Sequence, residues 1–289
     1  MWPRGYNSAF LLLGLLALTY VLIAALLMIF EERLIFHPRR YPAGNWNPSA
    51  IPFEDVRFTA TDGTNLHGWY VPHEQPRAYI LYCHGNAGHL ADREFLLRIL
   101  HDHIHATVFI FDYRGYGRSE GRPNEAGVLL DARAARNAFA HQAKITPADM
   151  ILMGRSLGGA VAVALAASEQ PLGLVLESTF TSLPDVAATL YPWLPVRWLL
   201  RSQFDSLTGI QSYPGPLLQS HGDRDEIIPF ELGRRLHAPV AGPKQWITIP
   251  GGTHNSTQSA EYYVALADFL HQLPGSAAPV PTPAQDRLP

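Results

Sequence analysis

A glycine-framed turn around Ser156, Gly-Arg-Ser-Leu-Gly-Gly, constrains the fold of this chain more than any other feature. The apolar run 150–153 comes directly before the turn, and an alanine-rich pattern of helical period follows it over 159–168. So sharp a turn from strand to helix strains the serine backbone, and the residues two before and two after it must be small. Gly154 and Gly158 meet that requirement, so the segment predicts a strand–turn–helix unit with the Ser156 hydroxyl exposed at its tip.

Short β-rich runs alternate with helical patterns through the body of the chain, residues 33–273, which is typical of parallel βαβ units. Several runs are apolar throughout, as strands covered by helices on both faces should be. The first two runs flank a Thr-Asp-Gly-Thr turn and indicate an antiparallel pair. We expect strands at 56–60, 66–71, 78–83, 107–112, 150–154, 172–177, 216–220 and 245–249, and helices at 92–101, 125–142, 158–168 and 259–273.

The segment after the expected strand 172–177 departs from this alternation. Its stretch Leu-Tyr-Pro-Trp-Leu-Pro-Val-Arg-Trp-Leu-Leu holds too many large apolar side chains for a plain surface loop. We interpret residues 180–212 as a short helical cap over the mouth of the sheet, with Trp193 and Trp198 as candidate substrate-binding residues. The alternative is that these side chains only pack the cap onto the body.

An uncharged apolar segment covers residues 9–30 at the start of the chain. A helix of this length spans about 33 Å, enough to cross a hydrocarbon core of about 30 Å. A cleaved signal peptide is the competing interpretation. However, its apolar region is usually only about 7–15 residues long, and no small-x-small cleavage site follows here. We therefore expect residues 1–32 to form a single-pass membrane anchor.

The segments that flank the body indicate its side of the membrane and the nature of the C-terminal tail. Arg33, Arg39 and Arg40 follow the apolar segment and only Arg4 precedes it, so the positive-inside rule favours a body on the cytoplasmic side. Residues 274–289 are rich in proline and alanine and lack apolar periodicity, which predicts a disordered tail.

Composition narrows the function classes. A net charge of −3 gives no reason to expect a nucleic-acid partner, and the 13 histidines show no metal-ligand spacing. The single cysteine, Cys83, rules out an intrachain disulfide. Because it lies within an apolar run, we expect it to be a small core residue rather than a reactive thiol.

A serine hydroxyl becomes a strong nucleophile only beside a positioned base, which in turn needs an orienting carboxylate. His254 follows the expected strand 245–249 in a Gly-Gly-Thr-His-Asn loop, and Asp225 follows the strand before it. Both loops leave the carboxyl ends of strands, where α/β active sites gather. We therefore predict Ser156, His254 and Asp225 as nucleophile, base and acid. Asp223 and Glu177 remain alternatives for the acid, and a serine that only caps the helix remains the alternative to catalysis.

Two backbone N–H groups are candidates to stabilise an oxyanion. One belongs to Leu157, at the start of the helix after the turn. The other belongs to Asn86, in the His-Gly-Asn-Ala-Gly loop after the third strand, where glycines let backbone groups face a substrate.

Five motifs occur in order: HGNAG at 84–88, DYRGYGRSEG at 112–121, GRSLGGA at 154–160, HGDRDEIIP at 221–229 and GGTHN at 251–255. Together they resemble the α/β-hydrolase superfamily. More narrowly, they resemble its membrane-anchored, short-cap subgroup of abhydrolase-domain and serine-aminopeptidase-like hydrolases. The resemblance implies a mostly parallel eight-stranded sheet with helices on both faces, an acyl-transfer reaction without a cofactor, and the five roles assigned above.

The resemblance names the chemistry but not the substrate, because members span esterases, lipases, thioesterases and aminopeptidases. The apolar cap and the anchor favour a small-molecule or lipid acyl ester or thioester. An aminopeptidase would need a carboxylate to hold the amino group of its substrate, and the obvious acids of the cap are Asp185 and Asp205. A catalytically silent scaffold on the same fold is the alternative from another class.

Overall fold

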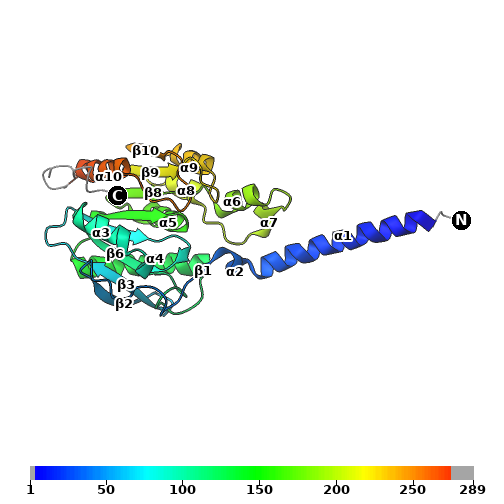
Figure 1. The fold of residues 1–289 in the computed structure, drawn as a ribbon, viewed down its shortest axis with the longest axis horizontal. Helices are drawn as coiled ribbons and strands as arrows, with labels where there is room; N and C mark the ends of the chain where they lie inside the picture. Colours follow the sequence, from blue (N-terminus) through cyan, green and yellow to red (C-terminus); the bar gives the residue numbers. More distant parts are fainter. Residues whose placement is uncertain (1–3, 275–289) are drawn as a thin grey trace.

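The computed structural model describes residues 4–274. A long helix, α1 (Arg4–Ile29), extends away from an α/β body and meets it through the short helix α2 (Glu31–Ile35) (Figure 1). The disordered tail predicted at 274–289 lies, apart from its first residue, outside the described residues.

The body is built on the predicted eight-stranded, mostly parallel sheet. The strand order is β10-β9-β8-β7-β4-β6-β3-β2. Strand β3 is antiparallel to both of its neighbours, and every other adjacent pair is parallel. The strands are β2 (Glu54–Thr59), β3 (Asn65–Val71), β4 (Ala78–Cys83), β6 (Ala106–Asp112), β7 (Met150–Arg155), β8 (Gly173–Glu177), β9 (Leu217–Gly222) and β10 (Lys244–Ile249).

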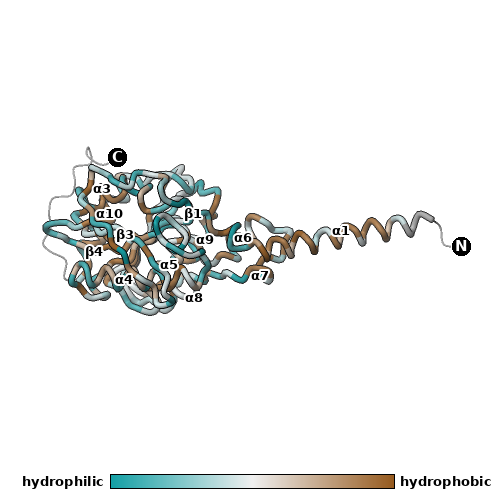
Figure 2. Tube along the Cα trace, turned by 90° about the horizontal axis from the view of Figure 1, so that it is seen from below, coloured by the Kyte–Doolittle hydropathy of each residue, from teal (hydrophilic) through white to brown (hydrophobic). Residues whose placement is uncertain are grey.

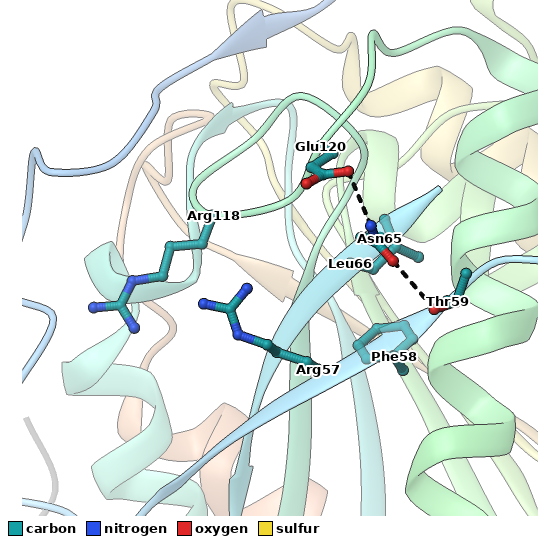
Figure 3. Close-up of a pocket in the computed structure, with 7 residues that line it drawn as sticks. All are labelled: Arg57, Phe58, Thr59, Asn65, Leu66, Arg118 and Glu120. Carbon is teal, nitrogen blue, oxygen red and sulfur yellow. Dashed lines mark hydrogen bonds between the residues drawn. The ribbon is translucent and has the colours of Figure 1, made fainter. Parts of the chain in front are cut away.

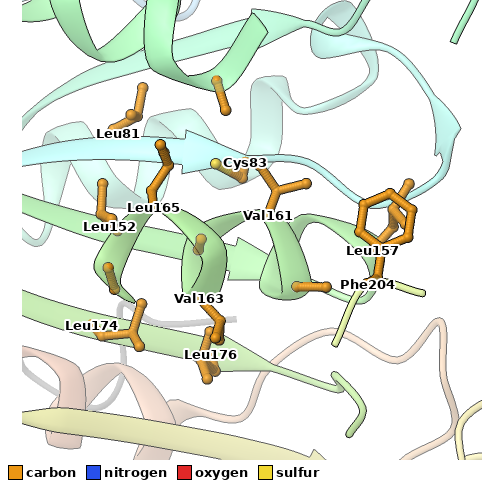
Figure 4. Close-up of a cluster of buried hydrophobic side chains, with 14 of the residues drawn as sticks. Leu81, Cys83, Leu152, Leu157, Val161, Val163, Leu165, Leu174, Leu176 and Phe204 are labelled. Atoms are coloured by element: carbon orange, nitrogen blue, oxygen red, sulfur yellow. The ribbon is translucent and has the colours of Figure 1, made fainter. Parts of the chain in front are cut away.

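Helices cover both faces of the sheet, so its central strands are buried on both sides and β6 is buried at every position. One face packs against α4 (Glu125–Ala143), α5 (Leu157–Glu169), α8 (Ser206–Gln211) and α9 (Phe230–His237). The other packs against α3 (Glu94–Asp102) and α10 (Ala260–Gln272). Figure 4 shows side chains of α5, such as Val161 and Leu165, packed over β4, β7 and β8.

Capping side chains set the starts of the principal helices. The Asn124 side chain accepts a hydrogen bond from Gly127 N–H at 2.8 Å, and α4 begins there. The Ser259 hydroxyl caps α10 in the same way. Short 3₁₀ turns at η1 (Leu90–Asp92) and η2 (Pro147–Asp149) complete the connections.

The link between α1 and the body contains elements that the sequence did not predict. Strand β1 (His37–Pro38) pairs in parallel with β5 (Ala87–Gly88), and Phe36 is buried in the core. The domain boundary expected after residue 32 therefore falls inside α2. Two-residue strands and a five-residue helix are too short to show a hydrophobic period, which explains why the pattern missed them.

The segment predicted as a cap comprises α6 (Leu183–Leu190), α7 (Val196–Leu199) and α8. Helix α8 packs against α5 and belongs to the body. Helices α6 and α7 project beyond the sheet and lie beside the end of α1 that joins the body (Figures 1 and 2). We refer to residues 183–200 as the projecting cap.

The arginines of the 112–121 motif bond neighbouring loops. Arg114 forms ion pairs with Asp131 at 2.8 Å and with Asp62 at 2.7 Å. The Arg118 guanidinium lies over the Trp46 ring, 4.7 Å from its centroid. These contacts hold the loop between β6 and α4.

The core position of Cys83 generates a direct prediction. Its side chain is fully buried at the end of β4, and burial raises the pKa of the thiol to about 12. We expect the native protein to resist alkylation by iodoacetamide at neutral pH and to react fully once it is unfolded in guanidinium, as followed by intact-mass spectrometry. An Ala148→Cys variant, with the new thiol at an exposed position, is the positive control. Fast labelling of native Cys83 would contradict the assigned packing.

Candidate active site

Ser156 lies at the turn between β7 and α5, with φ of 54° and ψ of −122°. The strain that the sequence predicts is therefore present. A Cβ added at Gly154 would collide with the Gly158 carbonyl, and one added at Gly158 would collide with the Cys83 carbonyl. Only glycine fits at these two positions, and the turn brings Ser156 to the carboxyl edge of the sheet.

The structure brings together the three residues predicted as nucleophile, base and acid. His254 Nε2 lies 3.1 Å from Ser156 Oγ, and His254 Nδ1 lies 2.8 Å from Asp225 Oδ2. His254 and Asp225 are both buried. With Nδ1 protonated and donating to Asp225, Nε2 is free to accept the serine proton, which is the arrangement that general-base catalysis requires.

Asp225 is held as a charged acceptor. Its Oδ1 accepts hydrogen bonds from the N–H groups of Ile227 at 3.0 Å and Ile228 at 2.8 Å. Burial alone would raise the pKa of Asp225, but hydrogen bonds from His221, His254 and Ile228 hold it well below its usual range. The carboxylate is therefore ionised at neutral pH.

The two alternative acids, Asp223 and Glu177, make no hydrogen bond to the His254 ring within residues 4–274. Asp223 is exposed, and its Oδ1 accepts a hydrogen bond from Gly251 N–H at 2.6 Å, which fixes the start of the histidine loop. Glu177 ends β8 and is buried beside the Tyr262 side chain. Among the carboxylates of residues 4–274, the one that bonds to the His254 ring is Asp225.

Two side chains that the sequence did not single out hold the histidine loop. Arg155 Nη2 donates to the His254 carbonyl at 2.6 Å and to the Ser256 carbonyl at 3.0 Å. Glu226 accepts a hydrogen bond from His254 N–H at 3.2 Å. Arg155 occupies a variable position of the G-x-S-x-G pattern, so no sequence signal marked it.

The loop after β4 lies against the nucleophile. A Cβ at Gly85 would be 3.6 Å from the Ser156 Cβ. The next side chain, Asn86, is fixed from two directions: its Oδ1 accepts from Tyr116 Oη at 2.8 Å and from His37 N–H at 3.2 Å. Its Nδ2 also donates to the carbonyl of Ile35.

His84 begins this loop and is fully buried. Desolvation lowers its pKa to about 4, so the ring is neutral at physiological pH. Its Nδ1 lies 2.7 Å from the Gly85 carbonyl, and its own carbonyl accepts from Tyr113 Oη at 2.9 Å. His84 therefore shapes the loop without adding charge next to Ser156.

A cavity of about 890 Å³ opens directly onto these groups. Gly85, Asn86, Ser156, Leu157 and His254 line one part of it, together with the buried Glu177. Much of the remaining wall is apolar, although Glu31, Asp92 and Arg93 also line it. Its apolar side chains from α1, α2, residues 180–200 and the loop after β9 are Ile23, Leu27, Met28, Leu34, Ile35, Phe180, Leu183, Val186, Ala187, Leu190, Tyr191, Trp193, Leu194, Val196, Leu199, Leu200, Ile227 and Ile228.

The two candidate tryptophans differ in their position relative to the cavity. Trp193 lines the cavity. Trp198 is not part of the cavity wall and is 88% exposed. In the single turn of α7, the neighbouring Val196 and Leu199 face the cavity and Trp198 is left outside.

A second, smaller hollow of about 300 Å³ lies over β2 and β3 (Figure 3). Asn65 crosses it and joins Glu120 at 3.1 Å to Thr59 at 3.3 Å. Its walls hold none of the residues around Ser156, so the large cavity is the candidate active site.

Known proteins share both the sequence and the fold. Residues 74–213 match the family described as serine aminopeptidase S33. A protein of Mycobacterium tuberculosis is 41% identical over 238 residues, covering 82% of this chain and 84% of the relative. The α/β-hydrolase domain-containing protein WAV2 of Arabidopsis thaliana is 31% identical, with 81% and 84% coverage.

Among solved structures, the esterase Pf2001 of Pyrococcus furiosus superposes with a TM-score of 0.66 at 20% identity, over 83% of this chain and 98% of the esterase. A similarity at that identity supports the fold. Together with the sheet order and the sequence relatives, it makes this chain a hydrolase of the α/β-hydrolase superfamily.

Proposed function

We propose that this protein is a serine hydrolase that cleaves carboxylic esters or thioesters of apolar acyl groups. The observation that carries the proposal is the chain of contacts from Ser156 Oγ through His254 to Asp225. In the first step Ser156 Oγ attacks the acyl carbonyl while His254 Nε2 takes its proton. The imidazolium then protonates the leaving oxygen or sulfur. Water activated by His254 finally releases the acid and restores the serine.

The negative charge that develops on the carbonyl oxygen needs donors close to Ser156. We assign the backbone N–H groups of Leu157 and Asn86 to this role. Leu157 is the first residue of α5, where unpaired N–H groups and the helix dipole favour an anion. Asn86 has its side chain fixed by Tyr116 and His37, so its backbone is held beside the serine.

The cavity wall supports an apolar acyl group as substrate. Most of its side chains are aliphatic or aromatic, and Ser156 and His254 are among the polar minority. A pocket of this kind gains binding free energy from the apolar area it covers and orients the reacting bond with a few polar groups.

We further propose that α1 anchors the enzyme in a membrane, with the catalytic domain on the cytoplasmic side. Within the described residues, Ser8–Ile29 forms one helix long and apolar enough to cross a bilayer. Arg33, Arg39 and Arg40 follow it, in agreement with the positive-inside rule.

An aminopeptidase is the second candidate, and two observations favour it. The matching family is described as serine aminopeptidase S33. In addition, Glu177 provides a buried carboxylate in the cavity wall, a group that could hold a substrate ammonium.

A substrate series separates the two candidates. We expect p-nitrophenyl esters to be hydrolysed with a preference for medium or long acyl chains over acetate, and aminoacyl p-nitroanilides to remain uncleaved. The readout is release of the chromophore by the full-length protein in detergent. Efficient cleavage of the anilides, abolished by Glu177→Gln, would establish the aminopeptidase instead.

Replacing the nucleophile tests the enzyme class. We expect Ser156→Ala to lower kcat for p-nitrophenyl esters by at least about 10³-fold, because the acyl-enzyme cannot form. Circular dichroism and thermal unfolding should remain close to those of the wild type. A Ser156→Ala protein with near-normal turnover would refute the mechanism, and inactivity of both proteins towards all esters and anilides would favour the silent scaffold.

Two carboxylates of the loop after β9, Asp225 and Asp223, allow a variant and its matched control to be compared. We expect Asp225→Asn to lower kcat by about 10⁴-fold, because it removes the charge that orients and stabilises the imidazolium. Asp223→Asn keeps a side-chain oxygen for Gly251 N–H and should change kcat less than about tenfold. Steady-state kinetics on one ester compares the two variants, and equal losses would argue against Asp225 as the acid.

A further inference from the structure

Helix α1 and the projecting cap are joined far from the point where the chain enters the body. Tyr20 Oη donates a hydrogen bond to the carbonyl of Trp193 at 3.3 Å. Nine residues separate Tyr20 from Ile29, the end of α1, so the contact lies about 14 Å along the helix. That distance is close to the thickness of one leaflet of a hydrocarbon core about 30 Å thick.

The hydrogen bond also satisfies two polar groups that hydrocarbon would leave unpaired. A backbone carbonyl without a partner is strongly unfavourable in a bilayer, because no water is there to replace the lost hydrogen bond. Tyr20 supplies the donor for the Trp193 carbonyl, and Thr19 next to it donates to the Leu15 carbonyl within α1.

A buried carboxylate in α2 fixes the base of α1 against the two residues that directly follow the projecting cap. Glu31 accepts hydrogen bonds from Ser202 N–H at 2.7 Å and Arg201 N–H at 3.1 Å, and Arg201 also donates to the Met28 carbonyl at 3.3 Å. Burial alone would raise the pKa of Glu31, but the hydrogen bonds from Ser202 and Arg201 hold it below its usual value. Two sets of contacts therefore hold α1 and the cap region together, one at Tyr20 and one at Glu31.

The projecting cap exposes three large aromatic side chains, beside the charged Arg197 that pairs with Asp185. Trp198 is 88% exposed, Trp193 59% and Tyr191 50%. Figure 2 shows that α1 is apolar along its length and that α6 and α7 lie beside its end. In water this much exposed aromatic surface is unfavourable, whereas tryptophan and tyrosine are enriched at membrane–water interfaces.

The same helix also forms part of the active-site cavity. Ile23, Leu27 and Met28 of α1 line it together with Ser156 and His254. Ile23 lies between the Tyr20 contact and the end of the helix, so the cavity extends along the part of α1 that we assign to one leaflet.

We propose that the projecting cap is embedded in the same leaflet as α1, and that the cavity receives its substrate acyl chain laterally from the bilayer. The substrate class is then a bilayer-resident lipid ester rather than a water-soluble ester. This inference rests on the proposed hydrolase function for its chemistry, but the insertion of the cap does not depend on that function.

The depth of the cap is measured directly. In a Cys83→Ala background, Trp198→Cys is labelled with the fluorophore NBD and the full-length protein is reconstituted in phosphatidylcholine–phosphatidylglycerol vesicles. We expect a blue-shifted emission that is quenched by lipids carrying a doxyl group on the acyl chain. The same label at Ala148, an exposed position before β7 and hence at the other end of that strand from Ser156, should show neither effect. Water-like emission at both positions would overturn the proposal.

Entry of the substrate from the bilayer is tested by placing a charge at Trp198, which lies outside the cavity wall. We expect Trp198→Glu to lower turnover of a fluorogenic diacylglycerol ester in vesicles by about tenfold or more, because a carboxylate resists transfer into hydrocarbon. Turnover of p-nitrophenyl acetate in water should stay within about twofold of the wild type, since Trp198 does not line the cavity. Trp198→Phe should preserve both activities.

The outcomes distinguish failure of lateral substrate access from failure of the proposed hydrolase function. If Trp198→Glu hydrolyses the bilayer lipid as fast as the wild type, lateral access is wrong while the hydrolase stands. If neither substrate is hydrolysed by the wild type and Ser156 does not react with a fluorophosphonate, the proposed function fails. The quenching experiment then still decides whether the cap is inserted.

Discussion

The close approach of the β7–α5 turn to the end of β4 is the constraint on which the site depends. Gly158 lies against the carbonyls of Cys83 and His84, so close that a methyl group would collide with both. This contact holds the strained Ser156 in place and brings it beside the loop that follows β4. Because the sheet is parallel at these strands, the loops after β9 and β10 reach the same edge and deliver Asp225 and His254.

The N-terminal link does more than tether the body. Asn86, in the loop after β4, bonds to Ile35 and His37, and strand β1 pairs with β5 in that same loop. The backbone that we assign to oxyanion stabilisation is thus supported by residues that follow α1 within a few positions. The placement of α1 and the geometry of the site are coupled through a short run of backbone, and an attachment of this kind favours a single orientation of the cavity relative to α1.

Sequence patterns predicted the parts of this molecule that depend on local chemistry. The eight strands lie within a few residues of the expected ranges, because apolar runs between turn residues report burial directly. Ser156 and His254 could be named because each follows a strand within a motif that restricts its backbone. The choice among Asp225, Asp223 and Glu177 could not be made from spacing alone, and it depends on which carboxylate faces the His254 ring in three dimensions.

The features that the sequence missed are long-range contacts between polar groups. Glu31 reads as one more charge after an apolar helix, yet it is buried against Ser202. Arg155 holds the histidine loop from a position that the motif leaves free. Composition could not show which tryptophan of the cap lines the cavity, because the orientation of the single turn of α7 places Trp198 outside the wall. None of these has a periodicity to reveal it.

Activation of Ser156 for covalent catalysis within an apolar cavity can be measured by peptide mapping with mass spectrometry after treatment with a long-chain alkyl fluorophosphonate. We expect one adduct per chain, on the peptide that contains Ser156, formed faster with the long-chain reagent than with a short one and strongly slowed in Asp225→Asn. An unmodified Ser156 in a folded protein, or an adduct at another serine, would contradict this activation.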